Sequence, residues 1–559
     1  MRILLLTHAF NSLSQRLWLS LSAAGHELSV EFDINDAATR QAVALWRPDA
    51  VVAPFLKRAI AQHVWSCVPC FIVHPGPPGD RGRSALDWAI QQRRARWGVT
   101  VLQAVAELDA GPVWAHREFA LRAASKSSIY RREVTAAAVS AVHEALARLS
   151  AGQGPLLAVN AGDEGSKPGM RQRDRRIDWQ RDDTASVLAK LRAADGQPGV
   201  SDRYGNTVVR LHDAAPATAA CGEAGAWIGH AGESLLRATR DGAVWIGHLQ
   251  IVDAETGRHI KLPAVRALHA LSLPLPPAVD GADAPNRVDF RVEDGVGVLR
   301  FAFLNGALSL SRCQQLRAAI DQAACSPARA IVLLGGPEFW CNGMDLASIE
   351  ADPSPAEASL ANIEAIDAVC RALIELTGKW VIAAVCGNAG AGGVFMALAA
   401  DEVLVREGVV LNPHYRNMGN LYGSEYWTYL LPRRLGEDGA RALMATRLPL
   451  DAADAVRRGL FDALLPGDPD AFAAAAVAHA RRRIDAADCA DRLRAKAALR
   501  ARDEGLKPLA AYRDAELARM RENFFGFDTS YHIARFDFIT RTPHSRTPLH
   551  LARHRQRGG

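Results

Sequence analysis

Residues 71–82 read FIVHPGPPGDRG, so that an apolar strand ends at His74 and continues into a loop with three prolines. Proline fixes the φ dihedral, and we expect this loop to hold the histidine rigidly. Three more short apolar strands are expected before it, at residues 2–6, 27–32 and 50–52. A helical apolar pattern at residues 14–24 lies between the first two of them. This alternation predicts a parallel, doubly wound sheet, in which ligands bind at the carboxyl ends of the strands.

A carboxylate suited to His74 comes later in the chain. Residues 107–113 read ELDAGPV, which places Asp109 in a turn closed by glycine and proline. A histidine with a carboxylate is the minimum for proton handling during acyl transfer. We therefore expect His74 and Asp109 to form a catalytic pair, although a histidine in a loop is by itself more often structural.

Together these two motifs resemble the folate-dependent formyltransferases, which include the methionyl-tRNA and glycinamide ribonucleotide enzymes. The resemblance implies a Rossmann-like domain over residues 1–165 that binds 10-formyltetrahydrofolate, with His74 and Asp109 as catalytic residues. It also assigns four positions beside the cofactor, at Ile72, Arg81, Gly82 and Ser84.

Ile72 departs from that family, whose catalytic asparagine falls on this position. Isoleucine cannot donate a hydrogen bond to a tetrahedral oxyanion, and loss of such a donor costs about 2.7–4 kcal/mol where it acts. Two explanations stay open: either His74 carries more of the catalysis, or the formyl acceptor reacts more readily than an amine. A thiol fits the second one, since its pKa of about 8.5 makes it nucleophilic with little help from a base.

The middle of the chain predicts a small β domain. Residues 175–179 read RRIDW and precede a helix near residues 184–192. Short strands with glycine turns are then expected at residues 206–211, 242–250 and 259–262. The segment resembles the OB-like C-terminal domain of the tRNA formyltransferases and is assigned to residues 166–275. Residues 151–169 and 272–285, rich in glycine, alanine and proline, are expected to be linkers.

Strands and helices alternate again from about residue 288. The strands are expected at residues 296–303, 330–334 and 381–385, the helices at 311–324, 357–377 and 391–400, and mostly helical structure at 451–525. Two loops carry chemistry: residues 338–346 read EFWCNGMDL, and residues 379–393 read KWVIAAVCGNAGAGG. N–H groups at a glycine-rich turn before a helix favour a developing negative charge. Close packing of a helix on a strand explains such glycines equally well.

Together these loops resemble the enoyl-CoA hydratase (crotonase) superfamily, whose adenine-side loop is similar to LNGAL at residues 304–308. The resemblance implies a crotonase-like domain over residues 285–559 with coenzyme A or its thioester as ligand. It also implies two oxyanion-hole N–H groups, on Met344 and Gly392, and places Asn305 and Gly343 beside the coenzyme.

The two glutamates with which hydratases activate water fall here on Phe395 and His414. Phenylalanine cannot activate water, so we do not expect enoyl hydration. Residues 413–426 read PHYRNMGNLYGSEY, which is unusually polar and aromatic for this position. Tyr415 and Glu425 are the first candidates for proton transfer, and His414 is the next. A plain loop and helix surface is the alternative.

The order of the two halves resembles the HypX/HoxX family of hydrogenase maturation factors over the whole chain. The resemblance implies formation of carbon monoxide for the Fe(CN)₂CO centre of [NiFe]-hydrogenase, with 10-formyltetrahydrofolate as carbon source and hydrogenase assembly proteins as partners. Our hypothesis is formyl transfer to coenzyme A, followed by release of carbon monoxide from formyl-CoA. Two alternatives are a formyltransferase acting on an amine of a CoA-linked or nucleotide substrate, and a scaffold that binds folate and coenzyme A.

The expected fold class is α/β multidomain, in keeping with 559 residues, and 49% hydrophobic and 23% charged residues with a net charge of +5 are ordinary for a soluble globular protein. Nine cysteines without a complete disulfide framework favour the cytoplasm. The composition indicates neither nucleic-acid nor membrane binding. Cys67 and Cys70 form a Cys-x-x-Cys without a second pair, so no metal site is expected. The acid-free tail at residues 540–559 is rich in arginine. Arg131, Arg541 and Arg546 are candidates for clamping the phosphates of coenzyme A.

Overall fold

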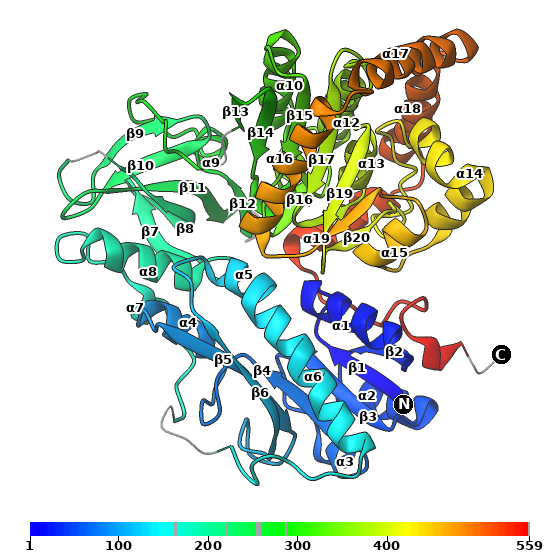
Figure 1. Cartoon of the computed structure of the whole chain (residues 1–559). Helices are drawn as coiled ribbons and strands as arrows, with labels where there is room; N and C mark the ends of the chain where they lie inside the picture. Colours follow the sequence, from blue (N-terminus) through cyan, green and yellow to red (C-terminus); the bar gives the residue numbers. More distant parts are fainter. Residues whose placement is uncertain (161–164, 219–221, 253–258, 286–287, 557–559) are drawn as a thin grey trace. The chain divides into compact units, whose positions relative to one another are not determined.

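The computed structural model describes residues 1–160, 165–218, 222–252, 259–285 and 288–556 (Figure 1). The chain forms two compact units, one of residues 1–285 with 543–559 and the other of residues 286–542. The sequence analysis groups the tail with the C-terminal domain, whereas the structure places residues from 543 onwards in the first unit.

The first sheet of this unit holds six strands in the order β2-β1-β3-β4-β5-β6. They are β1 (Arg2–Thr7), β2 (Glu27–Phe32), β3 (Ala50–Phe55), β4 (Cys70–His74), β5 (Arg96–Gln103) and β6 (Val113–Ala120). The expected parallel arrangement holds for β1 to β4. The last two strands were not expected from the sequence, and they are antiparallel. Strand β5 runs antiparallel to β4, and β6 antiparallel to β5.

The helices of this domain are α1 (Ser12–Ala23), α2 (Asp36–Trp46), α3 (Gln62–Trp65), α4 (Ala85–Gln91), α5 (Lys126–Ile129), a π turn (Tyr130–Val134) and α6 (Thr135–Ser150). Helix α1 begins where the side chain of Asn11 accepts the N–H of Ser14, and it ends just before Gly25, whose φ is +81°. Leu4 and Leu6 of β1 pack with Trp46 of α2 in a buried cluster. Alternation along a strand turns their neighbours to the opposite face of the sheet.

The small β domain contains a second sheet, in the order β7-β8-β11-β10-β9, with β12 paired to β11. Its elements are α7 (Gln172–Arg175), α8 (Thr184–Ala194), β7 (Val200–Tyr204), β8 (Thr207–Pro216), β9 (Trp227–Ala231), β10 (Ser234–Ala238), β11 (Ala243–Val252), β12 (His259–Pro263) and α9 (Ala264–Ala270). All its pairings are antiparallel, as in the β domain that the sequence analysis predicts.

The second unit is built on two sheets. The six-stranded sheet has the order β13-β14-β15-β17-β19-β22, and the four-stranded sheet the order β16-β18-β20-β21. Their strands are β13 (Val288–Glu293), β14 (Val296–Phe301), β15 (Ala330–Leu334), β16 (Phe339–Cys341), β17 (Trp380–Val385), β18 (Asn388–Gly390), β19 (Glu402–Arg406), β20 (Val410–Asn412), β21 (Leu450–Asp451) and β22 (Ala463–Leu465).

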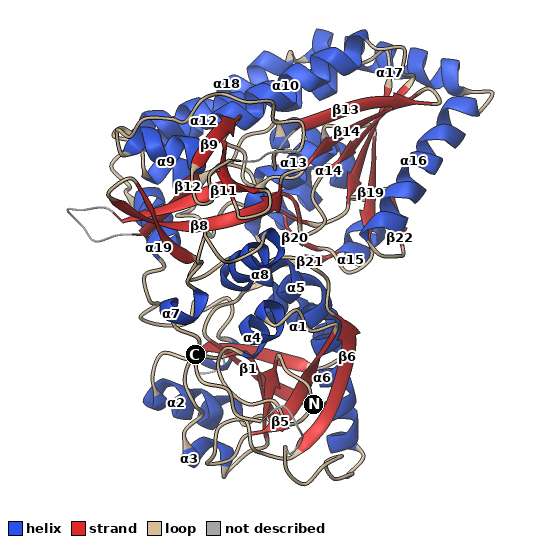
Figure 2. Ribbon diagram, turned by 90° about the vertical axis from the view of Figure 1, so that its left-hand side faces the viewer, coloured by secondary structure: helices blue, strands red, loops and turns tan. Residues whose placement is uncertain are grey.

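Helices cover both faces of the larger sheet (Figure 2). The helices of this unit are a 3₁₀ turn (Leu304–Gly306), α10 (Leu310–Cys325), α11 (Leu346–Glu350), α12 (Pro355–Glu375), α13 (Gly392–Leu398), α14 (Trp427–Ala445), α15 (Ala452–Arg457), α16 (Pro469–Asp485), α17 (Cys489–Leu506), α18 (Leu509–Phe525) and α19 (Ser530–Thr540). Phe472 of α16 packs with Val332 and Ile382 on one face. The main core, which includes Phe395 of α13 and Met520 of α18, fills the other.

The C-terminal segment, residues 543–556, pairs with the edge strand β2 of the first unit (red beside blue in Figure 1). The backbone N–H of Val30 donates to the carbonyl of Leu551, at 3.0 Å. Glu31 is completely buried, and its carboxylate lies 2.9 Å from His554 Nε2 and 2.9 Å from an Nη2 of Arg555. The hydroxyl of Thr547 donates to the same carboxylate, at 2.8 Å. This segment, which we call the C-terminal clasp, therefore closes the open edge of the first sheet.

Candidate active sites

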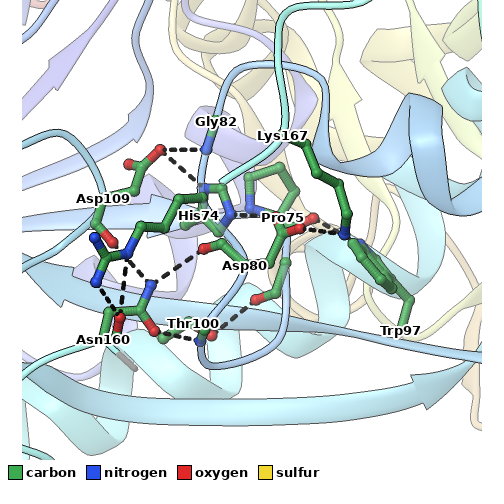
Figure 3. A network of polar contacts seen from close by, with 12 residues as sticks. His74, Pro75, Asp80, Gly82, Trp97, Thr100, Asp109, Asn160 and Lys167 are labelled. Atoms are coloured by element: carbon green, nitrogen blue, oxygen red, sulfur yellow. Dashed lines mark hydrogen bonds and ion pairs between the residues drawn. The ribbon is translucent and has the colours of Figure 1, made fainter. Parts of the chain in front are cut away.

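The first site lies at the carboxyl end of β4, where His74 sits between two carboxylates (Figure 3). Its Nε2 lies 2.8 Å from Oδ2 of Asp80, and its Nδ1 lies 3.6 Å from Oδ2 of Asp109. All three side chains are at least nine-tenths buried. A separation of 3.6 Å is too long for a hydrogen bond. Asp80 therefore orients the ring, whereas the Nδ1 side facing Asp109 can still meet another group.

Asp80 is the partner that the sequence analysis missed, although it lies only six residues after His74 in the same loop. Its second oxygen is 2.8 Å from Nζ of Lys167, and that ammonium group stands 4.9 Å from the centre of the Trp97 ring. A Cβ at Gly76 would collide with the Asp80 carboxylate and lie 2.6 Å from His74 Nε2. A glycine is therefore required where the loop passes the His74–Asp80 contact.

Asn160 bridges the loop that carries Asp80 and the turn that carries Asp109 (Figure 3). Its side-chain N–H₂ donates to the carbonyls of Asp80 and Asp109, at 3.1 and 2.8 Å, and its Oδ1 accepts the N–H of Gly79, at 2.5 Å. Both Asn160 and Lys167 lie in the stretch 151–169, which the sequence analysis expects to be a linker. That expectation is wrong for these two residues, because each of them builds the site.

The four positions expected beside the folate each have different contacts. Ile72 is half-buried in β4, two residues before His74 and thus on the same side of the strand. Gly82, at φ +114°, donates its N–H to Asp109 Oδ2 at 3.1 Å. The guanidinium of Arg81 donates hydrogen bonds to the carboxylate of Glu107 and to the backbone carbonyl of Asn160. The hydroxyl of Ser84 accepts the N–H of Met170, at 3.0 Å.

The second site lies where two loops of the second unit meet. Gly343 has φ +78°, and a Cβ on it would lie 3.4 Å from the backbone nitrogen of Gly392, so the loop after β16 abuts the start of α13. Within the described residues, no group accepts the N–H of Met344 or of Gly392. Two backbone donors from neighbouring loops are thus available, as stabilisation of an oxyanion requires.

Tyr415 and Glu425 come together beside these donors. The Tyr415 hydroxyl donates to Glu425 Oε2 at 2.5 Å, and its ring stacks on Phe395 with centroids 5.4 Å apart. A Cβ on Gly392 would collide with Oε1 of Glu425, so the carboxylate lies directly against that glycine. Burial raises the pKa of Glu425 to about 8 and that of Tyr415 well above its usual range. His414 is buried immediately before Tyr415 in the same loop.

The residues expected to hold coenzyme A are divided between the two units. In the second unit, Asn305 has φ +57°, and its carbonyl accepts the side chain of Asn342 at 2.8 Å; Arg541 ends α19. In the first unit, Arg131 is half-buried in the π turn and Arg546 is exposed in the C-terminal clasp.

Known proteins resemble both the part of the chain that holds the first site and the part that holds the second. The hydrogenase maturation factor HoxX of Bradyrhizobium diazoefficiens is 51% identical over 559 residues, covering all of this chain and 98% of its own length. The chain belongs to the HypX/HoxX family of hydrogenase maturation factors. A solved structure of a HypX, from Aquifex aeolicus in complex with tetrahydrofolic acid, is 44% identical, with a TM-score of 0.94 over 99% of both chains.

Two family models match separate parts of this HypX/HoxX chain. The C-terminal domain of formyl transferases matches residues 169–257, and enoyl-CoA hydratase/isomerase matches residues 293–529. The methionyl-tRNA formyltransferase of Thermotoga maritima is 26% identical over 216 residues, which is 36% of this chain and 66% of that enzyme. The fold class expected from the sequence is therefore confirmed: a Rossmann-like formyltransferase domain, a small OB-like domain and a crotonase-like domain.

The described residues hold neither a membrane-spanning helix nor a cluster of metal ligands. None of the helices found there has both the length and the apolar composition that a membrane-spanning segment needs. The same residues contain no group of three or more histidine, cysteine, aspartate or glutamate side chains placed to hold a metal ion.

Proposed function

We propose that this chain makes carbon monoxide for the Fe(CN)₂CO centre of [NiFe]-hydrogenase. It transfers the formyl group of 10-formyltetrahydrofolate to the thiol of coenzyme A and then decarbonylates formyl-CoA. The observation that carries this proposal is the buried Tyr415–Glu425 pair against Gly392, in a crotonase-like site whose usual glutamate position is Phe395. Such a site can polarise a thioester and move a proton, but it has lost the residue that would activate water.

In the first step, a C–S bond to the formyl carbon forms and the C–N10 bond of the folate breaks. The thiol proton passes to the departing nitrogen, so atoms and electrons balance without an oxidant. His74, oriented by Asp80, stabilises the tetrahedral oxyanion from its Nδ1 side, and Asp109 accepts or returns the proton there. The tetrahydrofolate complex of the Aquifex aeolicus HypX supports folate as the donor.

A thiol acceptor also accounts for Ile72. A thiol is nucleophilic with little help from a base, which fits a site where Ile72 offers no donor to the oxyanion. The crotonase-like domain supports coenzyme A as the source of that thiol. We assign Asn305 and Gly343 to the coenzyme side of that domain and Arg131, Arg541 and Arg546 to its phosphates.

In the second step, the N–H groups of Met344 and Gly392 hold the carbonyl oxygen of the formyl thioester. Glu425 as a carboxylate removes the formyl proton while the C–S bond breaks, which releases carbon monoxide. The thiolate that leaves takes a proton, delivered by Tyr415 or His414, and coenzyme A is regenerated. Carbon has the same oxidation state in the formyl group and in carbon monoxide, so no redox partner is needed.

The test is direct. The purified full-length chain is given 10-formyltetrahydrofolate labelled with carbon-13 in the formyl group, together with coenzyme A, and released gas is captured by deoxyhaemoglobin. We expect labelled carbon monoxide and unchanged total coenzyme A. A stable formylated amine without carbon monoxide would overturn the proposal in favour of an amine formyltransferase. Absence of any turnover until hydrogenase assembly proteins are added would overturn it in favour of a scaffold.

A further inference from the structure

Two more carboxyl groups lie behind Glu425, on separate helices of the second unit. Asp367 of α12 and Glu516 of α18 have no exposed surface, and Ser424, equally buried, lies between them. The Ser424 hydroxyl is 2.9 Å from each oxygen of Asp367 and 3.3 Å from Oε2 of Glu516. The mechanism proposed above uses none of these three side chains.

The single hydroxyl hydrogen of Ser424 cannot serve all of these contacts. A serine hydroxyl has one hydrogen and cannot donate to both carboxyl groups at once. If Ser424 donates to Asp367, no hydrogen lies between Ser424 Oγ and Glu516 Oε2 unless Glu516 carries a proton. If it donates to Glu516, the same holds for Asp367. A proton held between the two carboxyl groups, with Ser424 as the link, would remove the conflict in either case.

The charges around the cluster agree with a shared proton. The nearest cation to Asp367 is Arg513, whose Nε is 3.7 Å from Oδ2 and whose side chain is partly exposed. Three buried carboxylates beside one such cation would be strongly disfavoured. Two further cations, Arg371 of α12 and Arg519 of α18, act on Tyr426 and Tyr422 at the rim of the cluster. The remaining titratable groups around these carboxyls carry no positive charge: Cys313, Cys341, Glu364, Cys370, Tyr415, Tyr422 and Tyr426.

The same carboxyl groups hold an unusual backbone. Glu425 and Tyr426 have φ of +62° and +59°, two consecutive left-handed residues that are not glycine, which side chains disfavour. Asp367 accepts the N–H of Glu425 at 2.8 Å, and Glu516 accepts the N–H of Tyr426 at 2.9 Å. Thr428 adds two further donors to Glu516, at 2.8 and 2.5 Å. Each carboxyl group thus fixes one of the two left-handed residues.

We propose that Asp367, Ser424 and Glu516 form a shared-proton unit, which positions Glu425 against Gly392 and sets the pH at which Glu425 gains or loses its proton. These are positioning residues, and their catalytic effect rests on the proposed function of Glu425. Holding the left-handed turn aims the Glu425 carboxylate at the oxyanion-hole glycine. The single negative charge of the unit opposes a second negative charge on Glu425.

The direction of the pKa shifts agrees with this geometry. Burial raises the pKa of Asp367 to about 7 and that of Glu516 to about 8. For Glu425, whose pKa is raised to about 8, the largest cause is burial and the next is the charge of Asp367.

The first test does not depend on enzymatic activity. Infrared spectra of the full-length chain, with aspartate labelled by carbon-13 in one sample and glutamate in another, are recorded near neutral pH. We expect a protonated-carboxyl band that is split between both labels, and loss of the aspartate part in Asp367→Asn. Because Glu425 by itself gives a glutamate band near neutral pH, the decisive part is the aspartate one: its absence in the wild type, or its persistence in Asp367→Asn, would overturn the proposal, whatever the activity of the protein.

The second test follows the pH profile of carbon monoxide release from formyl-CoA. In Asp367→Asn or Glu516→Gln, the amide imitates the protonated partner and the other carboxylate keeps the charge, so the midpoint stays near that of the wild type. In the double variant the charge is lost, and the midpoint shifts down by about one pH unit. Glu357→Gln on α12 and Glu522→Gln on α18, both exposed, are matched controls.

The outcomes separate the two proposals. If the wild type releases no carbon monoxide from formyl-CoA, the proposed function fails. The inference is then decided by infrared spectra recorded over a range of pH, which give the pH at which the Glu425 carboxyl loses its proton in the wild type and in the double variant. If carbon monoxide forms and the double variant keeps the wild-type midpoint, the inference fails and the proposed function stands.

Discussion

The hydroxyl of Tyr415 donates to Oε2 of Glu425 across 2.5 Å, and neither side chain is more than 6% exposed. Burial raises the pKa of Glu425 to about 8, while the Tyr415 hydroxyl opposes this rise because it stabilises the carboxylate. The pair thus combines a base that titrates near neutral pH with a phenol that keeps its proton.

Glu425→Gln should abolish decarbonylation and spare formyl transfer. The amide fills the same space beside Gly392 but cannot take the formyl proton, and loss of a general base costs roughly 10²–10⁴-fold in rate. We expect formyl-CoA to accumulate when the variant receives 10-formyltetrahydrofolate and coenzyme A, as measured by mass spectrometry. Glu437→Gln, at an exposed position of α14, is the control. Normal carbon monoxide release by Glu425→Gln would assign the base to another residue.

Carbon monoxide release should increase with pH. Glu425 acts as a carboxylate, and its pKa is raised to about 8, so the rate from formyl-CoA should rise through a midpoint near that pH. In Tyr415→Phe the stacking on Phe395 is kept, but the hydrogen bond that lowers the pKa of Glu425 is lost. We therefore expect the midpoint to move upward, together with a lower maximal rate. A midpoint that moved downward would contradict the assigned donor and acceptor.

Asp80→Asn should impair formyl transfer even though Asp80 is not the residue that the sequence motif marks. Asparagine keeps the size of the side chain but no longer fixes the ring of His74 as a carboxylate does. We expect a fall of about 10²–10⁴-fold in production of formyl-CoA, close to that of His74→Gln. His63→Gln, at an exposed position of α3, controls for loss of a histidine. Unchanged transfer would leave Asp109 as the working partner.

Thermal stability of the second unit should fall as pH rises from 6 to 9. Asp367, Glu425 and Glu516 have folded-state pKa values raised to about 7, 8 and 8, above those of the unfolded chain. Their contribution to stability is complete at low pH and is lost as pH rises through these values. Calorimetry should show a decrease in Tm of about 2–4 °C per kcal/mol lost.

The double variant Asp367→Asn, Glu516→Gln provides the comparison for that experiment. With two of the three carboxyl groups removed, its Tm should change less over the same pH range. An equal decrease in both proteins would place the titrating groups elsewhere.

Removal of the C-terminal clasp should destabilise the first unit. A chain that ends at Thr542 leaves the carboxylate of Glu31 without His554 and Arg555, and loss of the partners of a buried charge costs about 3–5 kcal/mol. We expect the Tm of that unit to fall by about 10 °C, measured by calorimetry. Arg553→Ala, an exposed change in the same segment, should leave the Tm unchanged. Equal Tm values for the truncated and full-length chains would show that the clasp is dispensable.

The sequence predicted best where one short stretch carries both strand and loop. His74 follows an apolar strand, and its place at the end of β4 could be read directly from residues 71–82. Asp80 lies in the same stretch but in no family motif. Its role depends on Lys167, 87 positions away in the chain, and on how the loop folds past Gly76 to bring Asp80 to His74.

Long-range pairings set the limit of the prediction. Glu425 could be chosen from the polar stretch at residues 413–426, but Asp367 and Glu516 lie 58 and 91 positions away on amphipathic helices, where acidic residues ordinarily face water. Strand β6 was missed because its outer half is exposed and polar, and the periodicity of a buried strand is absent there. Both failures arise because burial is decided by elements far away in the chain.

The C-terminal clasp also imposes an order on biosynthesis. Edge strand β2 leaves the ribosome early, but its partner segment is translated last, after all of residues 286–542. About 510 residues separate β2 from the clasp, so at ordinary elongation rates the delay is on the order of 25–100 s, during which the β2 edge has no cover and Glu31 has no counter-ion. A nascent chain that stalls or terminates before residue 547 therefore lacks the residues that cover β2 and contact Glu31. The first unit is completed only by residues translated after the whole of the second unit.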